Sequence, residues 1–283
     1  MLRHGYRRSP ISWREISVKG AQGLWIIHNE SQKPDLVVYY CHGGGFSMGS
    51  SYFYLEFLLA LVSLLESDGG YRNPALFALE YTLVPDASFP TQLHQSIAGF
   101  EHVRSLVENA SKICFSGDSA GATLVLSLLL HIASSPYYEK RRPGYAILIS
   151  PWVSIVSPNN RDTPSDYLNA NSLELYGRQY AGSEKNLSNP LMSPGTCKDR
   201  DWWSKASPSA GLSFLYGSEE VLGPETRNLV ALLRKSGCCV CAREEPGEIH
   251  AWPVATLFLS DTQEERQKGL REIVKLIKQN IEV

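Results

Sequence analysis

The chain has 283 residues, a length that suits one α/β domain and is ample to bury a sheet on both faces. Its hydrophobic fraction of 43% and charged fraction of 20% are typical of a globular protein and exclude a highly charged, disordered chain. The formal net charge of −2 excludes a strongly basic domain, so no nucleic-acid partner is predicted.

The apolar stretches at residues 57–65 and 124–132 are too short to span a bilayer, so no stable membrane insertion is predicted. Residues 1–15 are basic but have no apolar run behind them, which argues against a secretory signal. The cysteines at 238, 239 and 241 lack the spacing of a zinc site. We therefore expect a cytoplasmic protein with free thiols and with neither a metal nor a cofactor.

Short apolar runs alternate with helix-length segments along the chain. Strands are predicted near residues 24–27, 36–40, 75–79, 112–115, 145–149, 213–216 and 240–243. Helices are predicted near residues 52–66, 91–109, 120–133, 224–236 and 262–280. This alternation predicts an α/β fold, a single domain over residues 1–283 with a mostly parallel central sheet and helices on both faces.

Residues 152–209 interrupt the alternation. The segment is rich in Pro, Asn, Ser and Trp, and it directly follows a predicted strand. A long irregular insertion of this kind is usually functional or disordered. We interpret it as a cap or lid over the active site, with a short helix near residues 173–180; a solvated surface loop is the alternative.

The sequence Gly-Asp-Ser-Ala-Gly at residues 117–121 joins a buried strand to an apolar helix. A strand, a tight glycine-flanked turn and a helix are the setting of a nucleophile elbow, which exposes a serine at the edge of a sheet. Ser119 is therefore the predicted nucleophile. The positive end of the following helix favours the anion that forms in acyl transfer.

The sequence His-Gly-Gly-Gly-Phe at residues 42–46 follows the strand near residues 36–40. Glycine-rich loops of this type supply backbone N–H groups to a developing oxyanion. We assign the oxyanion hole to Gly44, Gly45 and Ala120. His42 is expected to hold the loop rather than to act as a base. A phosphate loop is the alternative, but no Gly-Lys-Ser/Thr follows.

The other two members of a triad follow later strands. Glu220 comes just after the strand near residues 213–216 and directly before an apolar pair, so it is the predicted acid, whereas its neighbour Glu219 is expected to be exposed. His250 lies in a loop after the last predicted strand and is the predicted base. The order serine, acid, histidine is the one expected for this fold. A substrate pocket is predicted to be lined by aromatic side chains, namely Phe46, Trp152, Trp202, Trp203 and Trp252.

These motifs, in this order, resemble the hormone-sensitive-lipase branch of the α/β-hydrolase superfamily, and residues 80–90 are similar to a structural segment of that branch. The resemblance implies an α/β-hydrolase fold and a serine esterase. The chain departs from the branch by having Glu220 where members usually carry aspartate and Gln95 where they often carry an acidic residue. Only about forty residues precede the oxyanion loop, which implies a reduced cap or one completed by a second copy in a homodimer. Residues 20–25 and 218–222 are similar to fungal members, some of which deacetylate sterols or act in secondary metabolism.

The expected reaction is hydrolysis of a small-molecule carboxylic ester, with an acetyl or a short- to medium-chain acyl group, through an acyl-enzyme on Ser119. Two alternatives share these residues. One is an acyltransferase, cyclase or thioesterase of a biosynthetic pathway, which uses the same triad. The other is a non-catalytic small-molecule receptor on the same fold, a class that often lacks the histidine found here at His250.

Overall fold

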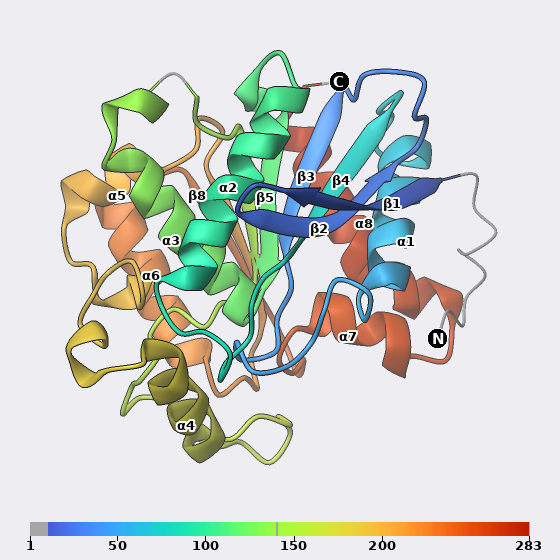
Figure 1. Cartoon of the computed structure of the whole chain (residues 1–283). Coiled ribbons are helices and arrows are strands. Elements are labelled where there is room, and N and C mark those ends of the chain that lie inside the picture. The colour runs from blue at the N-terminus through green and yellow to red at the C-terminus, as the bar shows by residue number, and fades with distance from the viewer. Residues whose placement is uncertain (1–10, 140, 283) are drawn as a thin grey trace.

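The computed structural model describes residues 11–139 and 141–282, so what was inferred from residues 1–10 lies outside the described residues. Eight strands form one sheet in the order β1-β2-β4-β3-β5-β6-β7-β8 (Figure 1). The pairs β1–β2 and β2–β4 are antiparallel and the other five pairs are parallel. The strands are β1 (Ser12–Val18), β2 (Ala21–Ile27), β3 (Leu36–Cys41), β4 (Pro74–Glu80), β5 (Ile113–Asp118), β6 (Tyr145–Ile149), β7 (Leu212–Gly217) and β8 (Val240–Glu245).

Helices cover both faces of the sheet. They are α1 (Leu55–Ser67), α2 (Thr91–Leu106), α3 (Ala120–Ala133), α4 (Ala170–Ala181), α5 (Arg200–Ala206), α6 (Gly223–Lys235), α7 (Trp252–Leu259) and α8 (Gln263–Asn280). The apolar side chains of α1, α7 and α8 belong to one core, and those of α2, α3, α5 and α6 to the other. The predicted α/β-hydrolase architecture is confirmed.

Strand β3 shows why the sheet needs two cores. All six of its residues are buried, and alternate side chains point to opposite faces. Val37, Tyr39 and Cys41 join the core under α2 and α3, whereas Leu36, Val38 and Tyr40 join the core under α1 and α8. The continuous apolar run predicted to be a buried parallel strand therefore serves two cores at once.

The sequence patterns do not predict three of these elements. Helix α5 has only seven residues and lies within the irregular 152–209 segment. Strand β1 is an edge strand in which no residue is fully buried, so its apolar pattern is weak. Helix α7 starts with Trp252 and Pro253 directly after the loop of His250, where proline suits the first turn of a helix.

Gln95, which departs from the acidic residue common in similar proteins, makes two hydrogen bonds with Thr82. Its amide oxygen accepts from the Thr82 N–H at 2.9 Å, and its amide nitrogen donates to the Thr82 hydroxyl at 2.8 Å.

The segment of residues 152–209 divides into two parts. Helix α4, longer than the helix predicted near residues 173–180, lies at the bottom of Figure 1. Helix α5 instead packs against α3 and α6, beside the main body of the fold. Only the part around α4 thus stands where a cap could stand.

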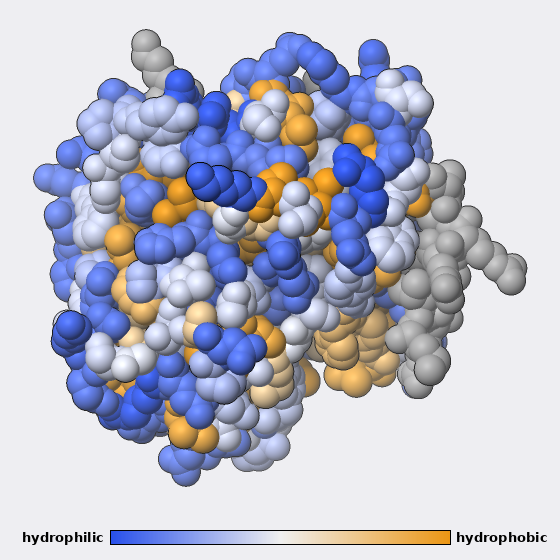
Figure 2. Space-filling view, in the orientation of Figure 1, coloured by the Kyte–Doolittle hydropathy of each residue, from blue (hydrophilic) through white to orange (hydrophobic). Residues whose placement is uncertain are grey.

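Within the described residues, every helix is too short or too polar to cross a membrane. The face shown in Figure 2 is largely hydrophilic, with hydrophobic side chains gathered over α7. There Leu259 is 71% exposed at the end of the helix.

Candidate active site

Ser119 stands in a strained turn between β5 and α3. Its backbone has φ +52° and ψ −119°, a combination that a residue with a side chain rarely adopts. The Ser119 N–H donates to the Ile149 carbonyl at 2.9 Å, and its carbonyl accepts from the Trp152 N–H at 3.2 Å. A Cβ on Gly121 would lie 2.0 Å from the Cys41 carbonyl oxygen, so only glycine allows α3 to begin this close to β3.

The glycine loop after β3 presents unpaired amides beside this turn. Gly44 has φ +115°, and a Cβ there would lie 2.0 Å from the Met48 carbonyl oxygen. The N–H groups of Gly44 and Gly45 have no hydrogen-bond acceptor in the part of the chain that the structure describes. Ala120 is the first residue of α3, where helix geometry leaves the N–H unpaired. Donors of this kind can receive a developing negative oxygen.

Asp118, the residue before Ser119, holds the glycine loop in place. Its Oδ1 accepts from the Tyr40 hydroxyl at 2.8 Å and from the Gly43 N–H at 2.9 Å. Its Oδ2 accepts from the Tyr54 hydroxyl at 2.7 Å. Burial raises the pKa of Asp118, and the two tyrosine hydrogen bonds oppose that shift. One buried side chain therefore ties the start of the glycine loop to the Ser119 turn.

His42 packs inside the same loop, as expected from its position before the glycines. Its ring stacks on Tyr81 with centroids 4.3 Å apart, and Nδ1 lies 2.7 Å from the Gly43 carbonyl oxygen. Burial lowers the pKa of His42, so the neutral ring donates from Nδ1–H to that carbonyl. The residue shapes the loop rather than facing the nucleophile.

Glu220 is buried and faces the imidazole of His250. Its Oε1 accepts from the Gly217 N–H at 2.7 Å and from the Ser150 hydroxyl. Its Oε2 lies 3.5 Å from His250 Nδ1. The Ser150 oxygen in turn accepts from the Ala251 N–H at 2.8 Å, so one hydroxyl links the acid to the residue after the histidine.

The environment of His250 favours its charged form despite complete burial. Burial lowers the pKa of the imidazole, but the carboxylates of Glu220, Asp166 and Asp118 together outweigh this and raise it. Glu219 takes no part: its Oε1 accepts a hydrogen bond from the neighbouring Ser218 hydroxyl. Of the two adjacent glutamates, Glu220 alone lies beside the ring.

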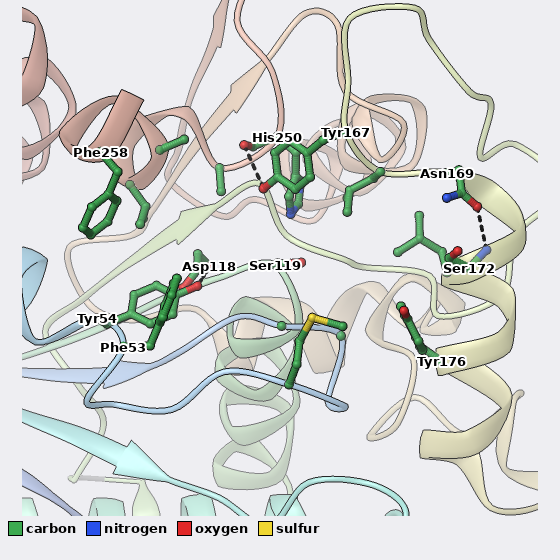
Figure 3. A pocket seen from close by; sticks show the side chains of 18 residues that line it. Phe53, Tyr54, Asp118, Ser119, Tyr167, Asn169, Ser172, Tyr176, His250 and Phe258 are labelled. Atoms are coloured by element: carbon green, nitrogen blue, oxygen red, sulfur yellow. Dashed lines mark hydrogen bonds between the residues drawn. The ribbon is translucent and has the colours of Figure 1, made fainter. Parts of the chain in front are cut away.

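Ser119 and His250 line the same pocket, which has a volume of about 380 Å³. In Figure 3 they lie between Phe53 and Phe258 on one side and the α4 residues Ser172 and Tyr176 on the other. The remaining lining residues are Gly44, Gly45, Met48, Tyr54, Asp118, Tyr167, Leu168, Asn169, Leu173, Ala251, Val254 and Ala255.

The expected aromatic lining is wrong, because none of its five members belongs to this pocket. Phe46 is fully buried and stacks on Tyr180 with centroids 3.6 Å apart. Trp152 is likewise completely buried in the core under α3. The indole N–H groups of Trp202 and Trp203 donate to the carbonyls of Leu130 and Cys197, at 2.8 and 3.1 Å. Trp252 is buried beneath Arg243 and Lys268.

Several residues that line the pocket were not predicted from the sequence. Asp118 lies within the Gly-Asp-Ser-Ala-Gly motif, and Phe53 and Tyr54 come soon after the glycine loop, so proximity to the motifs could have indicated them. Phe258 belongs to α7, which follows His250 directly. Tyr167 stands in the irregular 152–209 segment, where no local pattern marks it.

Comparisons with known proteins identify the family to which this fold belongs. A family profile described as alpha/beta hydrolase fold matches residues 38–254. An acetyl-hydrolase of Streptomyces hygroscopicus is 29% identical over 223 residues, covering 75% of this chain and 67% of that protein. An acetyl esterase of Salmonella schwarzengrund is 28% identical over 54% of this chain, but the match spans only 47% of its own length.

Solved structures give the same fold. The crystal structure of an esterase from the bacterial hormone-sensitive lipase family superposes with a TM-score of 0.79 at 23% identity, covering 96% of this chain and 85% of that one. At that identity the likeness concerns the fold. Because the family profile matches residues 38–254, from β3 to α7, the chain belongs to the α/β-hydrolase fold family.

Proposed function

We propose that the chain is a serine esterase that hydrolyses small carboxylic esters, acetyl esters among them, through an acyl-enzyme on Ser119. The observation that carries the proposal is the joint placement of Ser119 and His250 in one pocket, with the Glu220 carboxylate behind the imidazole. A pocket of about 380 Å³ lies near the small end of ligand sites, which supports a small substrate. The names of the two acetyl-hydrolysing relatives support the acetyl group.

The reaction follows from these positions. As the Ser119 hydroxyl oxygen attacks the ester carbonyl carbon, His250 takes the hydroxyl proton and the carbonyl electron pair moves onto oxygen. That oxygen faces the amides of Gly44, Gly45 and Ala120. When the intermediate collapses, the carbon–oxygen bond to the alcohol breaks and the alcohol takes the proton from His250. Water, deprotonated by the same imidazole, then attacks the carbonyl carbon of the acyl-enzyme. When this second intermediate collapses, the bond to the Ser119 oxygen breaks, Ser119 takes the proton back from His250, and the acid is released.

Glu220 contributes through the histidine. Its carboxylate keeps the Nδ1 proton on the imidazole, leaves the other nitrogen free to accept the serine proton, and stabilises the imidazolium that results. The Ser150 and Gly217 hydrogen bonds hold the carboxylate in that orientation. The glutamate in place of the usual aspartate therefore has the same role with a longer side chain.

The test is hydrolysis of p-nitrophenyl esters from acetate to decanoate by the wild type, Ser119→Ala and the control Ser116→Ala. Ser116 is a buried serine on β5, the strand that leads into the Ser119 turn, and it does not line the pocket. We expect Ser119→Ala to lose activity and labelling by a fluorophosphonate probe, while Ser116→Ala keeps both. Equal activity of Ser119→Ala and wild type would overturn the nucleophile assignment.

The same assay separates the alternatives. A wild type that takes up no fluorophosphonate would favour a receptor. A product made with an added alcohol or amine in preference to water would favour acyl transfer. Hydrolysis without such products supports the esterase.

We also propose that the protein functions in the cytoplasm. All six cysteines are free thiols, including the exposed Cys239 and Cys241, which suits a reducing compartment. Cell fractionation with an antibody to the chain tests this assignment, and recovery in a secreted or organellar fraction would contradict it.

A further inference from the structure

One carboxylate in the 152–209 segment contacts both the acid-bearing and the base-bearing loop. Asp166 Oδ2 accepts from the Val221 N–H at 2.9 Å, directly after Glu220. Asp166 Oδ1 accepts from the His250 N–H at 3.4 Å. These contacts bridge 55 and 84 positions of the sequence, respectively.

Thr163 and Tyr167, which flank Asp166 in the sequence, also form hydrogen bonds with the loops that carry Glu220 and His250. The Thr163 hydroxyl donates to the Glu219 carbonyl at 2.6 Å and accepts from the Asp166 N–H at 3.2 Å. The Tyr167 hydroxyl donates to the His250 carbonyl at 3.3 Å, a bond drawn in Figure 3. The Tyr167 and His250 rings are steeply inclined at 68°, with centroids 5.8 Å apart. Residues 163–167 are thus hydrogen-bonded to both the Glu220 loop and the His250 loop.

The charges around His250 come from three separate parts of the fold. Glu220 follows β7, Asp118 ends β5, and Asp166 belongs to the 152–209 segment. Tyr167 is the other titratable group against the ring; desolvation of its hydroxyl beside the His250 loop raises its pKa, so it is neutral near neutral pH. Among the carboxylates that favour the imidazolium, Asp166 alone also accepts from the histidine's own backbone.

We propose that Asp166 is a positioning residue for the reaction, fixing the acid loop and the histidine loop relative to each other from within the 152–209 segment. The inference rests on the proposed function of Ser119, Glu220 and His250. Asp166 does not line the substrate pocket, so it acts through Glu220 and His250 rather than on the substrate. The segment around α4 is then part of the catalytic machinery as well as a wall of the pocket.

The experiment compares Asp166→Asn with the matched control Asp35→Asn. Like Asp166, Asp35 accepts from two backbone N–H groups, those of Arg72 and Asn73 at 2.7 and 3.1 Å, but it lies outside the pocket. The asparagine at 166 keeps the shape but loses the charge and sets an amide N–H against a backbone N–H. For each protein we measure kcat and KM on p-nitrophenyl acetate from pH 5 to 9, the urea midpoint, and the His250 imidazole titration by NMR.

We expect Asp166→Asn to lower kcat about 10- to 100-fold with KM within about twofold of wild type, because misplaced catalytic groups slow chemistry without changing the pocket. The NMR titration of His250 and the acidic limb of the rate profile should both move to lower pH. Asp35→Asn should leave kcat, KM and both titrations unchanged.

Two outcomes would overturn the inference. The first is an Asp166→Asn protein whose kcat and His250 titration match the wild type. The second is an equal loss of rate and of urea midpoint in both variants, which would make the effect general destabilisation. The failure of the proposed function is distinguishable, because a wild type without esterase activity would show it before any variant is compared, while the NMR titration would still report on Asp166.

Discussion

The Tyr54 hydroxyl donates a 2.7 Å hydrogen bond to Asp118 Oδ2, joining the chain just before α1 to the residue next to the nucleophile. The same carboxylate accepts from the Gly43 N–H, so the oxyanion loop and the Ser119 turn share one buried anchor. Neither residue forms or breaks a bond in the proposed reaction. Their contact instead decides where the amides lie relative to the serine.

Tyr54→Phe tests this anchor. Removing a hydrogen bond to a buried carboxylate should lower the free energy of unfolding by ~1.5–3 kcal/mol and reduce kcat, because the oxyanion loop loses one of its supports. Urea unfolding and p-nitrophenyl acetate kinetics measure the two effects. The control is Tyr71→Phe, whose buried hydroxyl donates to the Ile281 carbonyl at 2.6 Å, far from the pocket. It should lose stability while keeping kcat, and equal rate losses in both variants would contradict the interpretation.

Glu220→Gln tests the acid and the sign of its electrostatic effect. The base must be neutral to accept the serine proton, so activity rises with pH through the pKa of His250. Because the Glu220 carboxylate raises that pKa, its neutralisation should shift the acidic limb of kcat/KM to lower pH. The plateau should fall roughly 10²- to 10⁴-fold, since the imidazolium loses its partner.

The adjacent residue provides the control for that experiment. Glu219→Gln removes the same charge one position earlier, where the side chain contacts Ser218 instead of the imidazole. Its pH profile and plateau should match the wild type. A larger effect at Glu219 than at Glu220 would reassign the acid.

Gly44→Ala tests the oxyanion loop. The backbone at this position has φ +115°, and the new Cβ would lie 2.0 Å from the Met48 carbonyl oxygen, so the loop must move. The displaced amide should lower kcat about 100-fold or more, as loss of one oxyanion donor does. Gly70→Ala is the control: it also has a positive φ, but no atom lies within 4 Å of the added Cβ. It should cost ~1–2 kcal/mol of stability and leave kcat unchanged. A Gly44→Ala enzyme with wild-type kcat would remove this loop from the mechanism.

Ala255→Trp tests the pocket assignment. Ala255 lies on α7 and lines the pocket together with Phe258, so a larger side chain there should shorten the space for the substrate. Rates on the octanoate and decanoate esters should fall about 10-fold or more relative to acetate. Trp202→Phe, outside the pocket, should leave the chain-length profile unchanged. A changed profile in Trp202→Phe alone would restore the tryptophan to the substrate site.

The amino-acid sequence by itself determined the parts of this protein that depend on local patterns. Buried parallel strands need continuous apolar runs, and a nucleophile elbow needs glycines around its serine, so the sheet and the position of Ser119 follow from short segments. Three elements were not predicted: β1 is a largely exposed edge strand, α5 is a short helix within an irregular segment, and α7 begins directly after a loop.

Only the tertiary structure decided what surrounds these elements. Trp152, Trp203 and Trp252 are buried in the core or under charged side chains, whereas Phe53, Tyr176 and Phe258 reach the pocket from three different segments. Asp166 meets Val221 and His250 across 55 and 84 residues, and Ser150 meets Glu220 across 70. An aromatic or acidic side chain has the same local signature in a core, on a surface or at a site, because which groups it contacts is set by how distant segments pack.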